Sequence, residues 1–113
     1  MTRNRMRPIH PGEILREEFL VPLGMSPHAL SQAIRVQATR VNDIVNGKRG
    51  VTADTALRLA RYFGNSPEFW LSLQAAHDLR AGERDAAARI KREISRDGQR
   101  DRAWAAGPIW SRS

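Results

Sequence analysis

The chain has 113 residues, which suits one compact domain with a modest core and a tail. Its formal net charge of +7, from 19 Lys and Arg against 12 Asp and Glu, favours a polyanionic partner, although a basic protein with no nucleic-acid role shows the same excess. No cysteine is present, which excludes disulfides, thiol nucleophiles and thiolate metal sites. No stretch reaches the roughly 18 to 20 apolar residues that a bilayer requires, so we expect a cytoplasmic protein without membrane attachment.

The first ten residues read as a basic arm without hydrophobic periodicity. The arm carries Arg3, Arg5 and Arg7. Such arms lie in a minor groove or along phosphates, and a disordered terminus has the same composition. A first helix is predicted to begin at Pro11, with acidic residues in its early turns, and to end near Leu20 because Pro22 disfavours helical geometry in the residue before it.

Two short helices with a tight turn between them are predicted next. The first opens with Ser26 as its N-cap and Pro27 in its first turn, and it runs for about two turns. The second is expected from about Ala38 to Asn46, with Gly47 as a left-handed cap. Their inward faces follow the i, i+3, i+4 spacing and consist of Leu30, Ile34, Val41, Ile44 and Val45.

Three further helices are predicted after residue 51. The fourth helix of the chain opens at Thr52, closes at Gly64, and is expected to bury Ala53, Ala56, Leu57, Ala60 and Phe63. The fifth opens at Ser66 and runs to about Leu79. Because Gly82 interrupts the pattern, a separate sixth helix is expected from about Glu83 to Arg96, with a thin apolar seam of Ala86, Ile90 and Ile94.

The pattern as a whole predicts an all-α fold, a five-helix helix-turn-helix domain with a C-terminal helical extension. The expected divisions are a basic N-terminal arm at 1–10, the DNA-binding domain at 11–80, and a C-terminal helix and tail at 81–113. The tail contains Trp104 and Trp110. These side chains either pack on the bundle, dock on a partner or remain in an unstructured segment.

The third helix carries the candidate reading surface. On a helical wheel its polar side chains point away from the apolar face, and they are of the types that contact bases and phosphates, although a solvated helix face is also polar. Ala38 begins this helix. The candidates for base contact are Gln37, Ala38, Thr39, Arg40, Asn42, Asp43 and Asn46. Asp43 either accepts from cytosine, orients Arg40 through an ion pair, which we favour, or serves stability.

Phosphate contacts are expected on both sides of the reading helix, where they fix its angle in the major groove. His28 and Ser31 lie on one flank, and Lys48 and Arg49 on the other. A module of this size buries on the order of 600 to 1,000 Å² on DNA, so strong binding requires two copies on a two-fold site. We therefore expect a homodimer, for which residues 66–94 offer the only remaining apolar surface.

Three segments resemble the HigA-type antitoxins, a branch of the Xre/lambda-repressor-like helix-turn-helix proteins. They are PIHPGEILREEFL at 8–20, the helix-turn-helix that follows, and VNDIVNGKRGVTADTALRLARYFGNSPEFWLSLQAAHDL at 41–79. The resemblance implies a lambda-repressor-like core, a homodimer, binding to double-stranded operator DNA, and neutralisation of a HigB-type toxin that cleaves mRNA. It also places the reading helix at residues 37–46, with Lys48 and Arg49 at its backbone-contacting end.

Two positions depart from the family's pattern. Many relatives have glycine at the bend where this chain has Arg35, so either Arg35 adopts a costly left-handed conformation or the turn differs. His28 replaces the usual glutamine, which implies a weaker or pH-dependent phosphate contact.

Other classes of function are also compatible with parts of the sequence. An enzyme is disfavoured because His10, His28 and His77 are far apart in the sequence, with no carboxylate at ligand spacing and no phosphate-binding loop, so no cofactor or metal is expected. A free-standing repressor without a toxin would use the same DNA chemistry. A protein-binding module that has lost DNA affinity would be unaffected by replacing Arg40 and Asn46.

Overall fold

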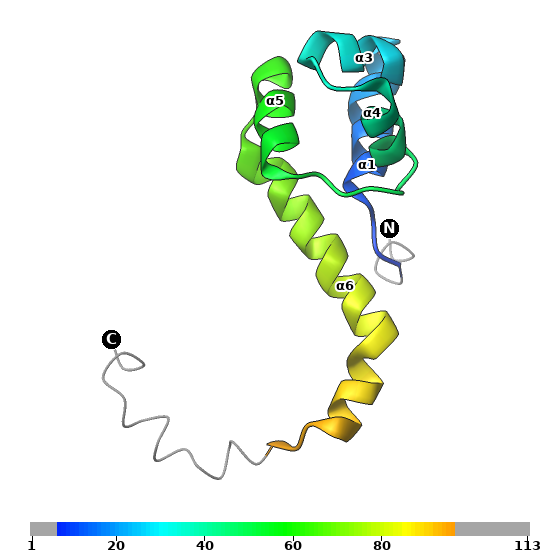
Figure 1. The fold of residues 1–113 in the computed structure, drawn as a ribbon, viewed down its shortest axis with the longest axis vertical. Coiled ribbons are helices and arrows are strands. Elements are labelled where there is room, and N and C mark those ends of the chain that lie inside the picture. The colour runs from blue at the N-terminus through cyan, green and yellow to red at the C-terminus, as the bar shows by residue number, and fades with distance from the viewer. Residues whose placement is uncertain (1–6, 97–113) are drawn as a thin grey trace, which may run out of the picture. The chain divides into compact units, whose positions relative to one another are not determined.

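The computed structural model describes residues 7–96, and all secondary structure in that range is helical (Figure 1). The elements are α1 (Pro11–Ile14), η2 (Leu15–Leu20), α2 (Val21–Leu23), α3 (Pro27–Ile34), α4 (Ala38–Val45), α5 (Ala53–Phe63) and α6 (Pro67–Glu93). The all-α expectation is confirmed. None of these helices is both long enough and apolar enough to cross a bilayer. The chain divides by its contacts into Met1–Ala81 and Gly82–Ser113, which are described separately.

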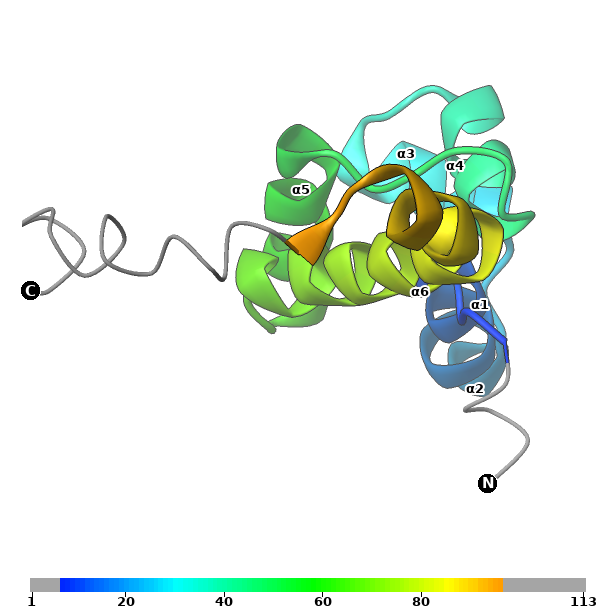
Figure 2. The ribbon, with the colours of Figure 1, turned by 90° about the horizontal axis from the view of Figure 1, so that it is seen from below.

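The first three elements form one helical column, in which η2 is a π-helical segment (Figure 2). The predicted end near Leu20 is wrong, because Val21 remains helical and the column ends only at Gly24, which has φ 62°. The backbone N–H of Val21 donates to the carbonyl of Arg16, five residues back. A proline ring inside an α-helix collides with the preceding turn, and the wider π turn gives Pro22 room.

The predicted starts of α3 and α5 are confirmed in detail. Ser26 caps α3, with its hydroxyl accepting from the N–H of Ala29 at 3.0 Å. Thr52 caps α5 in the same way through the N–H of Thr55. Each side-chain oxygen satisfies one of the backbone donors that a helix leaves unpaired in its first turn.

The buried face of α5 differs from the prediction. Leu57 is 58% exposed and Ala53 is also exposed, whereas Leu59 is buried. Tyr62 is 46% exposed. Residues 66–94 are therefore not the only remaining apolar surface, because α5 itself presents an exposed leucine and tyrosine.

The predicted break at Gly82 is also wrong, since α6 continues through this residue from Pro67 to Glu93. A glycine costs a helix about 1 kcal/mol relative to alanine but does not prevent it, and its neighbours here include Ala81 and Glu83, which favour helix. Of the predicted seam, Ile90 lies in the last turn of α6 and Ile94 follows directly after the helix, and both side chains are exposed. Trp104, Trp110, Arg3 and Arg5 lie outside the described residues.

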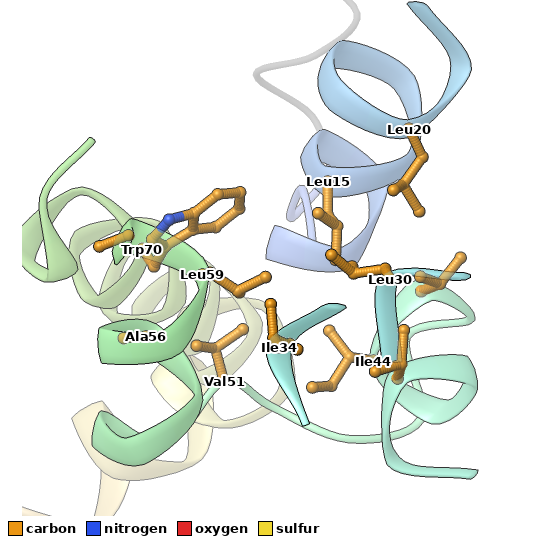
Figure 3. Close-up of a cluster of buried hydrophobic side chains, with 12 residues drawn as sticks. Leu15, Leu20, Leu30, Ile34, Ile44, Val51, Ala56, Leu59 and Trp70 are labelled. Carbon is orange, nitrogen blue, oxygen red and sulfur yellow. The ribbon is translucent and has the colours of Figure 1, made fainter. Parts of the chain in front are cut away.

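The core of the first unit is built from side chains of η2, α3, α4, α5 and the start of α6, together with Val51. Figure 3 shows Leu15, Leu30, Ile44, Leu59 and Trp70 among the buried side chains of this core. Trp70 is fully buried, and its indole N–H donates to the side chain of Asn65 at 2.9 Å, so its polar atom is satisfied. Burial of these large side chains fixes α3 and α4 against the column and α5, and this packing determines which face of α4 remains outside.

Candidate nucleic-acid interface

The inner face of α4 anchors the helix to the rest of the domain. Val41, Ile44 and Val45 are 1%, 1% and 6% exposed. The start of the first column lies directly against the end of α4, because a Cβ built on Gly12 would overlap the carbonyl oxygen of Ile44. Only glycine permits this backbone approach. The buried residues Pro11 and Gly12 therefore form a rigid support behind α4.

The outer face of α4 presents the predicted polar set to solvent. Gln37, Thr39, Asn42 and Asn46 are exposed, while Ala38, Arg40 and Asp43 are half-buried. The amide of Asn42 donates to the carbonyl of Ala38 at 3.0 Å, which orients Asn42 along its own helix. Gln37 is the N-cap residue but makes no capping bond through its side chain. The first turn of α4 thus has no side-chain cap, a geometry that suits contact with an anion.

The turn between α3 and α4 contains the predicted strained residue. Arg35 has φ 58° and ψ 51°, so the left-handed alternative is the one adopted. Arg58 of α5 closes this turn: its Nη1 donates to the carbonyls of Ile34 at 3.0 Å and Arg35 at 3.3 Å, while its Nε donates to Asp54 at 2.9 Å. One guanidinium group of α5 therefore satisfies both carbonyls at the end of α3, where the chain turns toward α4.

Sequence reasoning missed the role of Arg58. Asp54 and Arg58 form an i, i+4 ion pair of 2.9 Å within α5, but that spacing says nothing of a contact outside the helix. The carbonyl groups that Arg58 binds are 23 and 24 residues away in the sequence, and no local pattern identifies them.

The two residues predicted on the α3 flank differ in their surroundings. His28 is exposed. Ser31 is 3% exposed, and its hydroxyl donates to the carbonyl of His28 at 2.6 Å. A hydroxyl in this position serves the helix rather than a phosphate, so the expectation for Ser31 does not fit the structure.

On the other flank, Lys48 and Arg49 are exposed on the loop that follows α4. The helix ends as predicted at Gly47, which has φ 76°. The N–H of Gly47 donates to the carbonyl of Ile44 at 3.0 Å and that of Lys48 to Asp43 at 2.7 Å, which is the Schellman pattern. The helix end thus turns the chain so that both cations follow directly after the reading helix.

Asp43 pairs with a different cation from the one we favoured. Its carboxylate lies 3.9 Å from the guanidinium of Arg49, and the expected pair with Arg40 is not the one formed. Both partners are about half exposed, so the pair contributes little to stability. It does restrain the guanidinium of Arg49, while Arg40 extends from the face without this carboxylate as its partner.

The last arginine of the predicted arm has an intramolecular partner. Arg7 forms two parallel hydrogen bonds of 3.0 Å with the carboxylate of Glu13, and this contact lowers the pKa of Glu13 below its usual value. Arg7 is thereby attached to the first turn of α1.

Two of the three histidines, distant in the sequence, are in contact. The rings of His10 and His77 meet edge to face with centroids 4.9 Å apart. Burial, followed by the charge of His77, lowers the pKa of His10, while Asp78 and a hydrogen bond to the backbone of Arg49 act in the opposite direction. Within residues 7–96, no group of three His, Asp or Glu side chains is placed to hold a metal ion.

Comparison with known proteins identifies the family to which the chain is similar. A family model described as helix-turn-helix matches residues 15–70. Virulence-associated protein I of Dichelobacter nodosus is 57% identical over 83 residues, covering 74% of this chain and 77% of that protein. Antitoxin HigA-1 of Vibrio cholerae is 45% identical over 80 residues, covering 70% and 74%. The solved structure of the Pseudomonas aeruginosa antitoxin HigA with the higBA promoter superposes with a TM-score of 0.78 at 49% identity, covering 80% of this chain and 98% of that one.

Proposed function

Because the chain belongs to the HigA antitoxin family of helix-turn-helix proteins, we propose that it is the antitoxin of a type II toxin-antitoxin system. In this role it binds operator DNA to repress its own operon and neutralises a HigB-type mRNA-cleaving toxin by direct binding. The family consists of DNA-binding regulators rather than enzymes. The observation that carries the proposal is α4, whose apolar face is buried while its polar face is open at the surface.

The roles of the individual side chains follow from their chemistry. We assign base contacts to Arg40, whose guanidinium suits guanine, and to Gln37 and Asn46, whose amides suit adenine. Thr39 lies on the same face and suits either a base or a phosphate. Lys48 and Arg49 contact the phosphate backbone beyond the end of α4, and His28 contacts it from α3. Ser31 is left out of this interface because it is buried.

The DNA-binding half of the proposal is tested by footprinting the protein on the promoter of its own operon, followed by titrations of variants. Arg40→Ala is expected to weaken operator binding by about 1 to 3 kcal/mol and to relax the preference at one base pair. Lys48→Ala is expected to weaken binding to all sequences and to reduce the slope of log K against log salt by about 0.9. Arg92→Ala removes the same charge from α6 and serves as the matched control. Equal effects of all three variants would refute base reading by α4.

The toxin-binding half is tested by co-expression with the product of the neighbouring gene. A HigB-type toxin is expected to copurify with the protein and to lose its ribonuclease activity in the complex. Arg40→Ala should leave this inhibition intact if toxin and DNA use separate surfaces. A protein that binds its operator but has no ribonuclease encoded beside it would instead be a free-standing repressor, and the antitoxin assignment would fall.

We further propose that the protein acts as a homodimer in the cytoplasm, where its operator is found. One module buries too little surface on DNA for strong binding, and two-fold operators bind two-fold proteins. The exposed Leu57 and Tyr62 on α5 supply apolar area suited to such a contact. Sedimentation should show a dimer, and Leu57→Asp should dissociate it and weaken operator binding. A protein that is monomeric both free and on DNA would refute this proposal.

A further inference from the structure

The loop between α4 and α5 carries the two cations assigned to the DNA backbone. Lys48 and Arg49 are exposed on it, and Val51 at its far end is 5% exposed. The Schellman bonds hold the loop where it leaves α4, up to the N–H of Lys48. Neither bond reaches Arg49 or the residues that follow, so other contacts must hold that part of the loop.

Gln74 of α6 supplies one of these contacts. Its side-chain oxygen accepts from the N–H of Val51 at 2.7 Å. The amide also lies directly against Gly50, where a Cβ would come within 2.9 Å of the same oxygen. The missing side chain at Gly50 therefore lets the amide reach the backbone of the loop.

His10 holds the loop from the other side. Its Nδ1 accepts from the N–H of Gly12 at 2.9 Å, which caps α1. The ring also lies beside the loop, since a Cβ built on Gly47 would come within 3.9 Å of it, and its closeness to the backbone of Arg49 acts to raise the pKa of His10. A single imidazole thus connects the rigid start of α1 to the segment that bears both cations.

Contacts on α6 connect Gln74 with His10. The amide nitrogen of Gln74 donates to Asp78 at 2.9 Å, the same carboxylate oxygen lies 3.3 Å from Nδ1 of His77, and His77 packs edge to face on His10. We name His10, Gln74, His77 and Asp78 the loop clamp. All four lie within the unit Met1–Ala81.

We propose that Gln74 and His10 are positioning residues for operator binding. They fix the backbone of residues 49–51, so that Lys48 and Arg49 contact phosphates with little further loss of conformational entropy. This inference rests on the proposed operator binding and assigns residues outside the helix-turn-helix to it. Restraining a loop in its bound conformation raises affinity because less conformational entropy is lost on binding. Phosphate contacts also set the angle of the reading helix, so the loop clamp affects base contact indirectly.

The first test replaces Gln74 by a side chain of similar size that lacks an acceptor. Gln74→Leu is expected to reduce the slope of log K against log salt by about 1 to 2, the share of two phosphate contacts. Operator affinity at a fixed moderate salt concentration should fall about tenfold. Gly50→Ala should have the same effect while leaving Gln74 in the sequence, because the added methyl group displaces the amide. Both variants are titrated well below their melting temperatures, so that loss of folding is not measured as loss of binding.

A rescue experiment separates positioning from a general loss of packing. Gln74→Glu keeps an acceptor for Val51 but places a second carboxylate beside Asp78, so we expect it to weaken binding. Adding Asp78→Asn restores a donor toward the new carboxylate and returns the net charge to that of the original protein. The double variant should recover the original affinity and salt slope. A double variant as weak as Gln74→Glu alone would overturn the proposed arrangement.

A double-mutant cycle then tests whether Gln74 acts through the two cations. In the background of Lys48→Ala with Arg49→Ala, Gln74→Leu should cause no additional loss of affinity. An undiminished loss in that background, or an unchanged salt slope for Gln74→Leu alone, would refute the positioning role. If the original protein fails to bind its promoter, or if the two cation variants bind as tightly as it does, the proposed operator contacts fail instead, so the two failures are distinguishable.

Discussion

The left-handed turn at Arg35 allows a prediction whose sign runs against intuition, since removing a charged side chain should stabilise the protein. Arg35 has φ 58° and ψ 51° at the end of α3. A residue with a Cβ costs about 1 to 2 kcal/mol in this conformation. Glycine removes that cost but gives the unfolded chain more freedom, which offsets about 0.4 to 1 kcal/mol. Arg35→Gly should therefore stabilise the fold by about 1 kcal/mol.

Gly24 is the matched control at the end of α2. It has φ 62°, and a Cβ built there meets no atom within 4 Å, so Gly24→Ala tests the backbone cost without a steric collision. We expect Gly24→Ala to destabilise the protein by about 1 kcal/mol, with the opposite sign from Arg35→Gly. Arg35→Asn should lie between the original protein and Arg35→Gly, because asparagine tolerates this conformation better than arginine.

Urea unfolding followed by circular dichroism measures these differences, with the melting temperature as a second readout. A gain of 1 kcal/mol corresponds to about 4 to 8 °C for a domain of this size. The transition slope should stay constant, since only the stability is expected to change. If Gly24→Ala destabilises as expected and Arg35→Gly also destabilises, interactions of the Arg35 side chain outweigh its backbone cost, and the reasoning fails.

Three further predictions concern the support of α4, the continuity of α6 and the histidine contact. Gly12→Ala should destabilise the protein by about 3 kcal/mol in urea unfolding, because the new methyl group overlaps the carbonyl of Ile44; a neutral result would show that α1 does not touch α4. At Gly82 an added Cβ meets no atom within 4 Å, so Gly82→Ala should raise the free energy of unfolding by about 1 kcal/mol and increase the far-ultraviolet helical signal if the helix is continuous. No gain in either quantity would place a break in the helix at this residue. Burial, and then the charge of His77, lowers the pKa of His10 in the folded protein. Below about pH 6.5 the unfolded chain therefore binds more protons than the folded one, and the free energy of unfolding falls as the pH is lowered toward the folded pKa. His10→Asn keeps a capping oxygen but does not titrate, so this part of the pH dependence should disappear from its unfolding curves, and an unchanged curve would contradict the assignment.

The sequence determined the helices and their ends wherever the signal was local. Ser26 and Thr52 are capping residues because their side-chain oxygens reach donors only three residues away. Gly47 and Gly64 end helices because glycine adopts the left-handed conformation at little cost. The division of α4 into an apolar and a polar face could be predicted for the same reason, since a period of 3.6 residues separates Val41 and Ile44 from Thr39 and Arg40.

Local signals failed where another interaction outweighed them. Pro22 was expected to end the first helix, but a π turn accommodates its ring and the helix continues to Leu23. Gly82 was expected to break α6, but its cost of about 1 kcal/mol is small beside the helix-forming residues around it. Leu57 was expected inside because α5 has two apolar sides, and only packing shows that Leu59 is the buried one.

Tertiary structure alone decided which side chains hold the reading helix in place. Arg58 binds carbonyls more than 20 residues away, and Gln74 binds the N–H of Val51 across a similar separation. The pairing of Asp43 with Arg49 and the contact of His10 with His77 depend on how the chain folds back on itself. Periodicity and capping describe the chain over one or two helical turns, and these contacts lie beyond that range because the packing of the core sets them.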